Sequence, residues 1–147
     1  MEPEGVVHAL RNVHRMLAPG GLLLESHPLA GGSRVEVDGS TLGALDEREF
    51  ARELAVMERS LATLVAEGAF APQAERRFDV AMRFDTASEL LAEVVTWRGS
   101  TVSARLQRAV KRAEGPFAVR LTTLLRVYAS GSTRSPTRTR PASSTSP

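Results

Sequence analysis

A Pro19-Gly20-Gly21 turn joins an amphipathic segment to an unbroken apolar run and constrains the first 25 residues of this chain. Apolar residues recur at helical spacing from Val6 to Leu17, which predicts a helix that ends before Pro19, because the residue preceding a proline disfavours the α conformation. The two glycines can adopt positive φ and so permit a sharp reversal. The run Leu22–Leu24 predicts a strand covered on both faces, as in a parallel sheet. A helix feeding such a strand is the second half of a β-α-β unit, so we expect the neighbouring strand upstream of Met1.

Apolar spacing predicts three further helices. The clearest covers residues 47–67, where Asp46 and Glu49 have capping-box spacing and Gly68 can end the helix. Residues 86–97 and 101–113 form two shorter amphipathic segments separated by Gly-Ser.

Alternating residues predict the strands. Residues 76–85 place Phe78, Val80, Met82 and Phe84 on one face. Residues 34–39 indicate a short exposed β segment that ends in an Asp-Gly turn. A closing strand is expected over 117–128, with a bulge or a helical end where the alternation slips near Thr122-Thr123.

The last 18 residues differ in composition from the rest of the chain. Residues 130–147 are rich in Ser, Thr, Pro and Arg and nearly free of apolar side chains, so we expect a disordered tail after a single domain of residues 1–129. Three of the 19 basic residues lie in this tail, which leaves 16 basic against 17 acidic residues in the domain. That balance argues against a nucleic-acid partner despite the pI near 9.9.

The remaining composition excludes several classes of protein. The chain has no cysteine, and therefore neither disulfides nor thiolate sites. No apolar run is long enough to span a bilayer and no secretory signal opens the chain, so a cytoplasmic protein without a membrane partner is expected. His8 and His14 are six residues apart, not the four of a helical metal pair; we expect both at the surface and predict no metal ligands.

The string Arg15-x-Leu17-x-Pro19-Gly20-Gly21 followed by an apolar strand resembles the late helix-turn-strand segment of class I S-adenosylmethionine-dependent methyltransferases. The resemblance implies an α/β fold with part of a Rossmann-like sheet: Leu22–Glu25 as one parallel strand, then a helix, then an antiparallel strand pair. It covers roughly residues 1–128, but only the first 25 carry a motif. It further implies that the N-terminal, cofactor-binding half of that domain is absent.

The cofactor motif of that family has no counterpart here. In the family, the cofactor lies on a Gly-rich turn after the first strand, and no Gly-x-Gly-x-Gly follows a strand in this sequence. S-adenosylmethionine is therefore implied only for a complete domain, and no residue of its site can be assigned. Enzyme activity of this chain alone stays an open question.

Candidate site residues come from two places. Glu25 and His27 follow the predicted strand at the edge where open α/β sheets bind ligands, so His27 is our candidate base toward a small-molecule methyl acceptor, with Glu25 orienting it. A solvated loop histidine is the ordinary alternative. Trp97 and Arg98 are candidates to cover the substrate pocket, against the alternative that Trp97 is core.

Three hypotheses remain from the sequence. The chain is a partial methyltransferase that is inactive alone, or a non-catalytic binding or regulatory module retaining half of that fold, or a small structural protein unrelated to methyl transfer. An in-frame Gly-rich strand-turn-helix pattern upstream of Met1 would decide for the first hypothesis. Both of the first two leave one sheet edge uncovered, through which we expect self-association.

Overall fold

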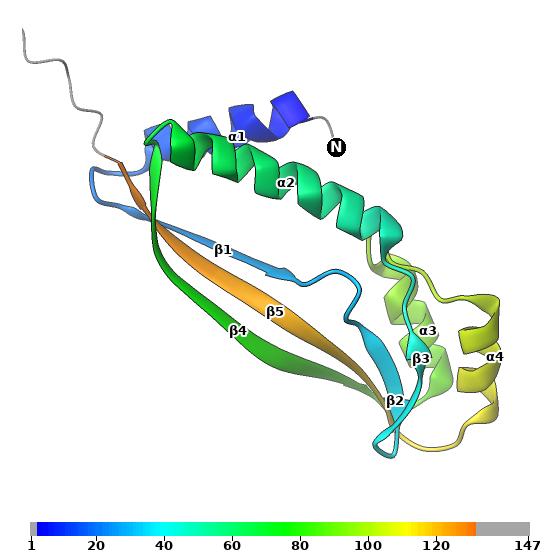
Figure 1. Ribbon diagram of the computed structural model, residues 1–147. Helices are drawn as coiled ribbons and strands as arrows, with labels where there is room; N and C mark the ends of the chain where they lie inside the picture. The colour runs from blue at the N-terminus through cyan, green and yellow to red at the C-terminus, as the bar shows by residue number, and fades with distance from the viewer. Residues whose placement is uncertain (1–2, 132–147) are drawn as a thin grey trace, which may run out of the picture.

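The computed structural model describes residues 3–131 and consists of four helices and one sheet of five strands (Figure 1). In chain order the elements are α1 (Pro3–Met16), β1 (Leu22–Pro28), β2 (Arg34–Val37), β3 (Ser40–Ala44), α2 (Arg48–Ala66), β4 (Phe70–Phe84), α3 (Ala87–Thr96), α4 (Ala104–Arg112) and β5 (Phe117–Ser130). The fold is therefore α/β, as expected.

The sheet is organised around β5. β4 pairs with one edge of β5 over its whole length, from Phe84 opposite Phe117 to Phe70 opposite Ser130. The other edge of β5 pairs first with β2 and then with β1. Among the strands described, β3 pairs only with β2. All of these pairings are antiparallel, so within residues 3–131 the parallel, Rossmann-like arrangement expected for Leu22–Glu25 is absent.

The helices cover opposite faces of the sheet at its two ends. We call the face that carries Phe117, Val119 and Leu121 the odd face, and the face that carries Leu124, Arg126 and Tyr128 the even face, because neighbouring residues of a strand point to opposite sides. α3 and α4 pack at the β2 end on the odd face, whereas α1 and α2 lie over β1 and the far end of β5 on the even face (Figure 1).

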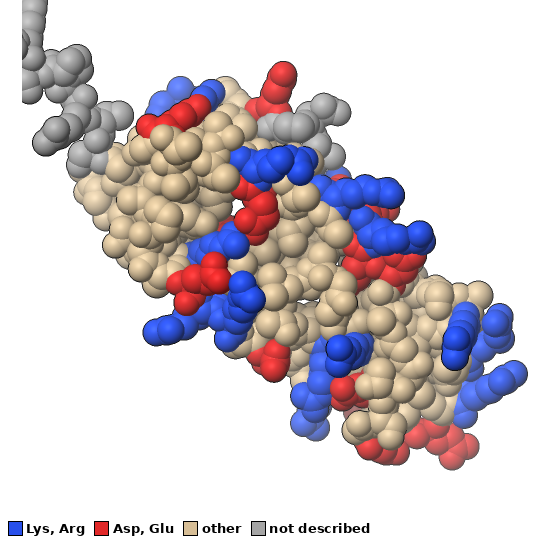
Figure 2. Space-filling view, viewed as in Figure 1, with Lys and Arg blue, Asp and Glu red and all other residues tan. Residues whose placement is uncertain are grey.

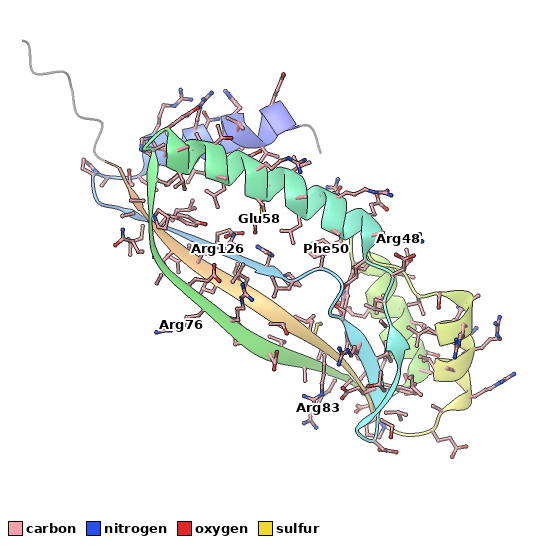
Figure 3. All side chains as sticks on the ribbon, in the orientation of Figure 1. Arg48, Phe50, Glu58, Arg76, Arg83 and Arg126 are labelled. Carbon is pink, nitrogen blue, oxygen red and sulfur yellow. The ribbon has the colours of Figure 1, made fainter. Side chains whose placement is uncertain are left out.

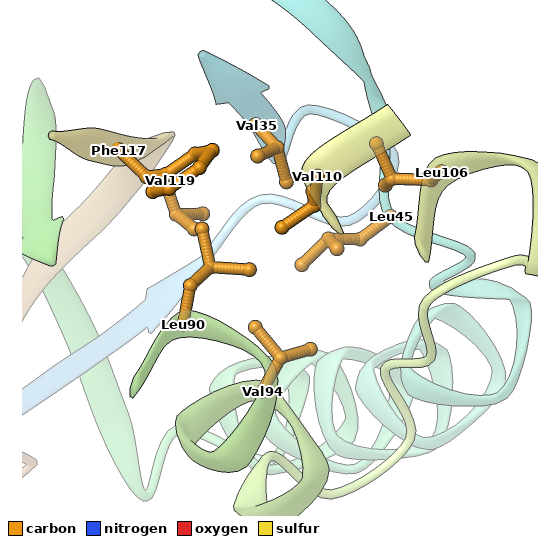
Figure 4. Close-up of a cluster of buried hydrophobic side chains, with 8 residues drawn as sticks. All are labelled: Val35, Leu45, Leu90, Val94, Leu106, Val110, Phe117 and Val119. Carbon is orange, nitrogen blue, oxygen red and sulfur yellow. The ribbon is translucent and has the colours of Figure 1, made fainter. Parts of the chain in front are cut away.

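Two apolar cores result from this arrangement. The first lies on the odd face between β2, β5 and the short helices; Figure 4 shows its eight buried side chains, Val35, Leu45, Leu90, Val94, Leu106, Val110, Phe117 and Val119. The second lies on the even face under α1 and α2 and comprises Leu61, Leu64, Phe70 and Tyr128. Both cores include side chains of β5.

This change of covered face explains the broken alternation near Thr122-Thr123. The pairing of β5 with β4 runs without a shift through these residues, so the expected bulge or helical end is absent there. Buried positions change from odd to even numbers because a different pair of helices covers each half of the strand. The one register shift between β4 and β5 lies instead between Pro72 and Ala74.

The helix predictions are confirmed to within a few residues, but one cap is wrong. Gly68 ends α2 with φ of 78°, as predicted. Glu47, not Asp46, is the N-cap of α2, and its side chain makes no capping hydrogen bond because its carboxylate accepts from Gly31 and Ser33 instead. The Asp46 side chain accepts from Arg48. A complete capping box is found instead at Thr86 and Glu89, where α3 begins.

The strand predictions are less complete. β4 begins six residues earlier than predicted, and β3 was not predicted. The Asp38-Gly39 turn is confirmed, with φ of 46° and 77°, and it connects β2 to β3. The prediction that residues 34–39 are exposed is confirmed for Arg34 and for the turn, but it is wrong for Val35, which is fully buried in the first core.

The domain boundary shifts slightly from its predicted place. Ser130 is the last residue of β5, and the Gly131 N–H donates to the carbonyl of Ala69. The tail was expected to begin at residue 130, so its first two residues belong to the fold. The rest of the predicted disordered tail, residues 132–147, lies outside the described residues.

The expectation that Leu22–Leu24 is covered on both faces is wrong for the described residues. Leu23 contributes to the second core on the even face, but Leu22 and Leu24 lie on the odd face and are 55% and 62% exposed. Phe78 of β4 is on the same face and is 46% exposed. Among the described strands, β1 pairs only with β5, so its other edge has no strand partner. The exposed apolar side chains of β1 thus lie beside a sheet edge that is open among the described residues.

We expect this combination to cause association of the purified chain through β1. The double variant Leu22→Thr/Leu24→Thr should reduce the associated fraction in size-exclusion chromatography with light scattering, since it keeps β propensity but removes apolar area. Val95→Thr serves as the control, because Val95 is 85% exposed on α3, away from β1. A strictly monomeric wild-type chain with a sharp, cooperative melt would contradict the expectation.

Candidate functional site

A buried charged cluster forms where β1 lies beneath α2. Glu25 and His27 are two residues apart on β1 and therefore share the even face. They lie opposite Arg126 and Leu124 of β5. α2 crosses above them and contributes Glu58, which Figure 3 shows close to Arg126. Residues distant in sequence thus meet because one strand pair and one helix hold them.

Both ring nitrogens of His27 face oxygen atoms. Nδ1 lies 2.8 Å from the backbone carbonyl of Pro28, a distance at which Nδ1–H donates. Nε2 lies 2.9 Å from Oε1 of Glu25 and 3.2 Å from Oε1 of Glu58. The His27 side chain is only 8% exposed. The geometry is poor for hydrogen bonds at this end of the ring, where Nε2 and both Glu25 oxygens are buried without a hydrogen-bond partner among residues 3–131.

Arg126 is the cation of the cluster. Its Nη1 donates to both carboxylate oxygens of Glu58 at 2.7 Å, and its Nε donates to Glu75 of β4 at 3.0 Å. The distance from Nη1 to Oε2 of Glu25 is 3.7 Å, too long for a hydrogen bond. Glu75 also pairs with the exposed Arg77. Glu25 is therefore the least compensated carboxylate.

Burial raises the pKa of Glu25 above its ordinary value, and this effect is larger than the lowering by His27 and Arg126. By contrast, the exposed Asp46 has its pKa lowered to about 2, chiefly by side-chain hydrogen bonds from Arg48. Comparison of the two carboxylates shows that loss of water raises the pKa of a carboxyl group, whereas hydrogen-bond donors lower it.

A separate pocket of about 180 Å³ opens at the end of β1 on the odd face. Its wall is almost entirely apolar and includes Phe50, Met82, Trp97 and Leu121. Pro28, the residue after His27, also borders it, as do Arg98, Ser33, Glu47 and Ser100. The pocket fits an apolar group of a small molecule.

Two contacts hold the pocket in shape. Gly99 approaches α2 so closely that a Cβ at this position would lie 2.7 Å from the backbone nitrogen of Phe50, which itself donates to the Gly99 carbonyl. On the opposite side, Glu47 accepts hydrogen bonds from the Gly31 backbone and from Ser33. The polar atoms of Glu47 are thereby used within the protein.

The predicted site residues fall into these two places. Glu25 and His27 are adjacent, as predicted, but His27 is buried beneath α2 and is not a solvated loop residue. Trp97 and Arg98 line the pocket, where Trp97 donates to Glu93 and Arg98 pairs with Glu53. Trp97 also packs against the first core.

Glu58 and Arg126 were not predicted. They are separated from Glu25 by 33 and 101 positions. One lies in a helix and the other in a strand, and the sequence pattern of such an element shows which of its faces is turned inward but not which distant residues lie beside that face. The prediction that His14 is a surface residue is wrong: its ring packs edge-on against Phe70 at 5.4 Å, and its Nε2 is buried. His8 is exposed, as predicted.

Charge is dispersed elsewhere. In the view of Figure 2, basic and acidic side chains are interspersed over the face that is seen. None of the described helices has the length and apolarity needed to cross a membrane.

No protein family, curated protein or solved structure matches this chain.

The raised pKa of Glu25 predicts that Glu25 destabilises the folded protein increasingly as the pH rises. The contribution of Glu25 to folding is most favourable below its unfolded pKa, near 4.5, and is lost as pH rises through the higher folded value. The free energy of unfolding of Glu25→Gln should therefore rise relative to that of wild type as the pH increases from about 4 to about 7. Urea unfolding in a chelating buffer measures this difference.

Asp46→Asn is the matched control of opposite sign. Asp46 has a lowered pKa, so its contribution is present above pH 3.8 and lost as pH falls through the folded value of about 2. The variant should be less stable than wild type near neutrality, and its deficit should shrink in acid. If Glu25→Gln follows the same pH trend as Asp46→Asn, burial does not dominate the pKa of Glu25.

Proposed function

We propose that this chain is the C-terminal part of a class I methyltransferase-like domain and that it supplies the pocket for a small-molecule methyl acceptor. One observation carries the proposal: the odd face of β1 is apolar and uncovered, and its outer edge is open. A further half-domain on that face and edge would bury Leu22 and Leu24, as their sequence predicts. The family resemblance of residues 9–25 says what that half would be.

The order of elements supports the proposal. α1 is followed by a turn in which Gly20 has φ of 75°, and then by β1. β1 is followed by the β2–β3 hairpin, which the resemblance does not include, and then by α2 and the antiparallel pair of β4 and β5, which it does. α3 and α4 lie between the two paired strands in chain order, and the connection between these helices carries Trp97 and Arg98.

The proposed acceptor site is the apolar pocket at the end of β1. Trp97 and Phe50 offer faces against which an apolar or aromatic acceptor can pack, and Arg98 stands at its border. Glu25 lies 2.9 Å from His27 and keeps the orienting role given to it from the sequence, although both side chains lie on the even face, opposite the pocket. The methyl donor would be held by the other half of the domain.

A non-catalytic binding module is the second candidate. The observation that favours it is that the pocket is complete within residues 28–121 and needs no cofactor for its walls. The two candidates differ in one property: only the first requires methyl transfer once the cofactor-binding half is present.

The chain alone should have negligible affinity for S-adenosylmethionine, since it lacks a Gly-rich turn to hold the cofactor. Isothermal titration of the purified chain with S-adenosylmethionine measures this. Micromolar binding would show that the cofactor site is built from residues assigned here to the pocket or the charged cluster.

In a protein that also contains the cofactor-binding half, His27→Ala should lower methyl transfer by about 10²-fold, the scale of a positioned general base, and leave cofactor affinity nearly unchanged. Trp97→Ala should raise the acceptor KM by about tenfold through lost apolar contact. Val95→Ala is the control, because Val95 is exposed on α3, the helix that ends just before Trp97.

The two variants separate the possible roles. Unaltered turnover in His27→Ala would remove the base role and leave the acceptor site with Trp97 and Arg98. Unaltered KM in Trp97→Ala would remove the pocket from the acceptor site. Absence of methyl transfer in a protein with both halves and bound cofactor would favour the binding module.

A further inference from the structure

The contact between His27 and its carboxylates is electrostatically incomplete. Because Nδ1 donates to the Pro28 carbonyl, a neutral ring carries its lone pair on Nε2, directed at Glu25 and Glu58. A lone pair cannot be stabilised by a carboxylate oxygen at 2.9 Å. A positive centre between these atoms would satisfy all of them.

The ring is held as metal-binding histidines are held. Such histidines donate one ring N–H to a backbone carbonyl or a carboxylate, which fixes the orientation of the other nitrogen. Here the Pro28 carbonyl fixes Nδ1 and directs Nε2 inward. The ring is nine-tenths buried, and Nε2 has no hydrogen-bond partner in the described part of the chain.

The spacing of the three side chains is compatible with one ion. One ligand atom each from Glu25, His27 and Glu58 lies within 4.8 Å of the others. Ligands bound tetrahedrally at about 2.1 Å are about 3.4 Å apart, so the observed separations need to change by only tenths of an ångström at Nε2. β1 and α2 are regular elements, which keeps the three donors in register.

The local charge also favours a cation. Glu25 and Glu58 face one guanidinium, that of Arg126, which is shared with Glu75. With a neutral His27 ring, the carboxylates are in excess. Each oxygen of Glu58 that accepts from Arg126 keeps a second lone pair for an ion.

We propose that Glu25, His27 and Glu58 bind a divalent transition-metal ion of the zinc class. Imidazole nitrogen with two carboxylates is a donor set suited to Zn²⁺, Mn²⁺ or Fe²⁺ rather than to Ca²⁺, which takes oxygen ligands alone. Three protein ligands leave one tetrahedral position for water. The proposal does not rest on methyl transfer: the pocket lies on the odd face, and an ion bound to Nε2 of His27 on the even face would take the place of the base role given to that ring.

The test is titration of the full chain with ZnCl₂ after removal of metals by a chelator and dialysis. Calorimetry should show one Zn²⁺ per chain, and thermal melting should show that Zn²⁺ raises the melting temperature. His27→Gln and Glu58→Gln should each weaken binding at least tenfold and abolish the thermal shift. Titration with Co²⁺ should give the intense visible absorption of a four-coordinate ion in wild type and not in His27→Gln.

Matched controls identify adventitious binding. His8→Gln removes an exposed histidine, and Glu67→Gln removes an exposed carboxylate of the α2 end that pairs with Arg11. Both variants should bind Zn²⁺ as wild type does. Circular dichroism checks that each variant is folded, and Glu58→Gln, which is about one-third exposed, serves if His27→Gln fails to fold.

Two results would overturn the proposal. Equal Zn²⁺ affinity of wild type, His27→Gln and Glu58→Gln would place any bound ion elsewhere. Absence of binding to folded wild-type chain would show that a proton on Nε2, and not a metal, compensates the two carboxylates.

Discussion

β5 forms backbone hydrogen bonds along both of its edges, and this pairing fixes where the side chains of both cores can lie. β4 is bound along one edge, whereas β1 and β2 divide the other. Because side chains alternate along a paired strand, the odd-numbered side chains of β5 serve the core under α3 and α4 at one end, and the even-numbered ones serve the core under α1 and α2 at the other.

The same pairing creates the contrast between the charged cluster and the pocket. His27 and Pro28 are neighbours in sequence but point to opposite faces of the sheet, the first toward Glu58 and the second toward the pocket. The two places are therefore linked through the peptide bond between His27 and Pro28, and the carbonyl of Pro28 accepts from Nδ1 of His27. A change in the position of the His27 ring would therefore reach the pocket border by moving the backbone at Pro28.

The sequence predicted local structure where local chemistry decides it. The helices of residues 47–67, 86–97 and 101–113 and the Asp38-Gly39 turn follow from apolar spacing and from residues that tolerate positive φ. The parallel pairing of Leu22–Glu25 does not occur within residues 3–131, because an apolar run tells how a strand is solvated and not which strand lies beside it.

The candidate site was predicted in part for the same reason. Glu25 and His27 were found because two positions on one strand share a face, and that rule is local. Glu58 and Arg126 depend on how α2 crosses the sheet, which no spacing within α2 or β5 encodes. Likewise, the slipped alternation at Thr122-Thr123 could be seen in the sequence, but its cause required knowing which helices cover each half of β5.

The position of β5 in chain order has a consequence for how the protein folds. β1 meets its partner residues about 100 positions later, as in the pair of Leu22 and Ala129, and β2 waits nearly as long for Val119. Such distant pairing slows folding, because the chain loses the entropy of closing a long loop before the stabilising strand contacts form. During synthesis neither core can close until β5 has left the ribosome, so α1, β1 and α2 expose their apolar sides throughout that interval. Both cores therefore depend on the last strand of the fold, and neither can be completed before it is available.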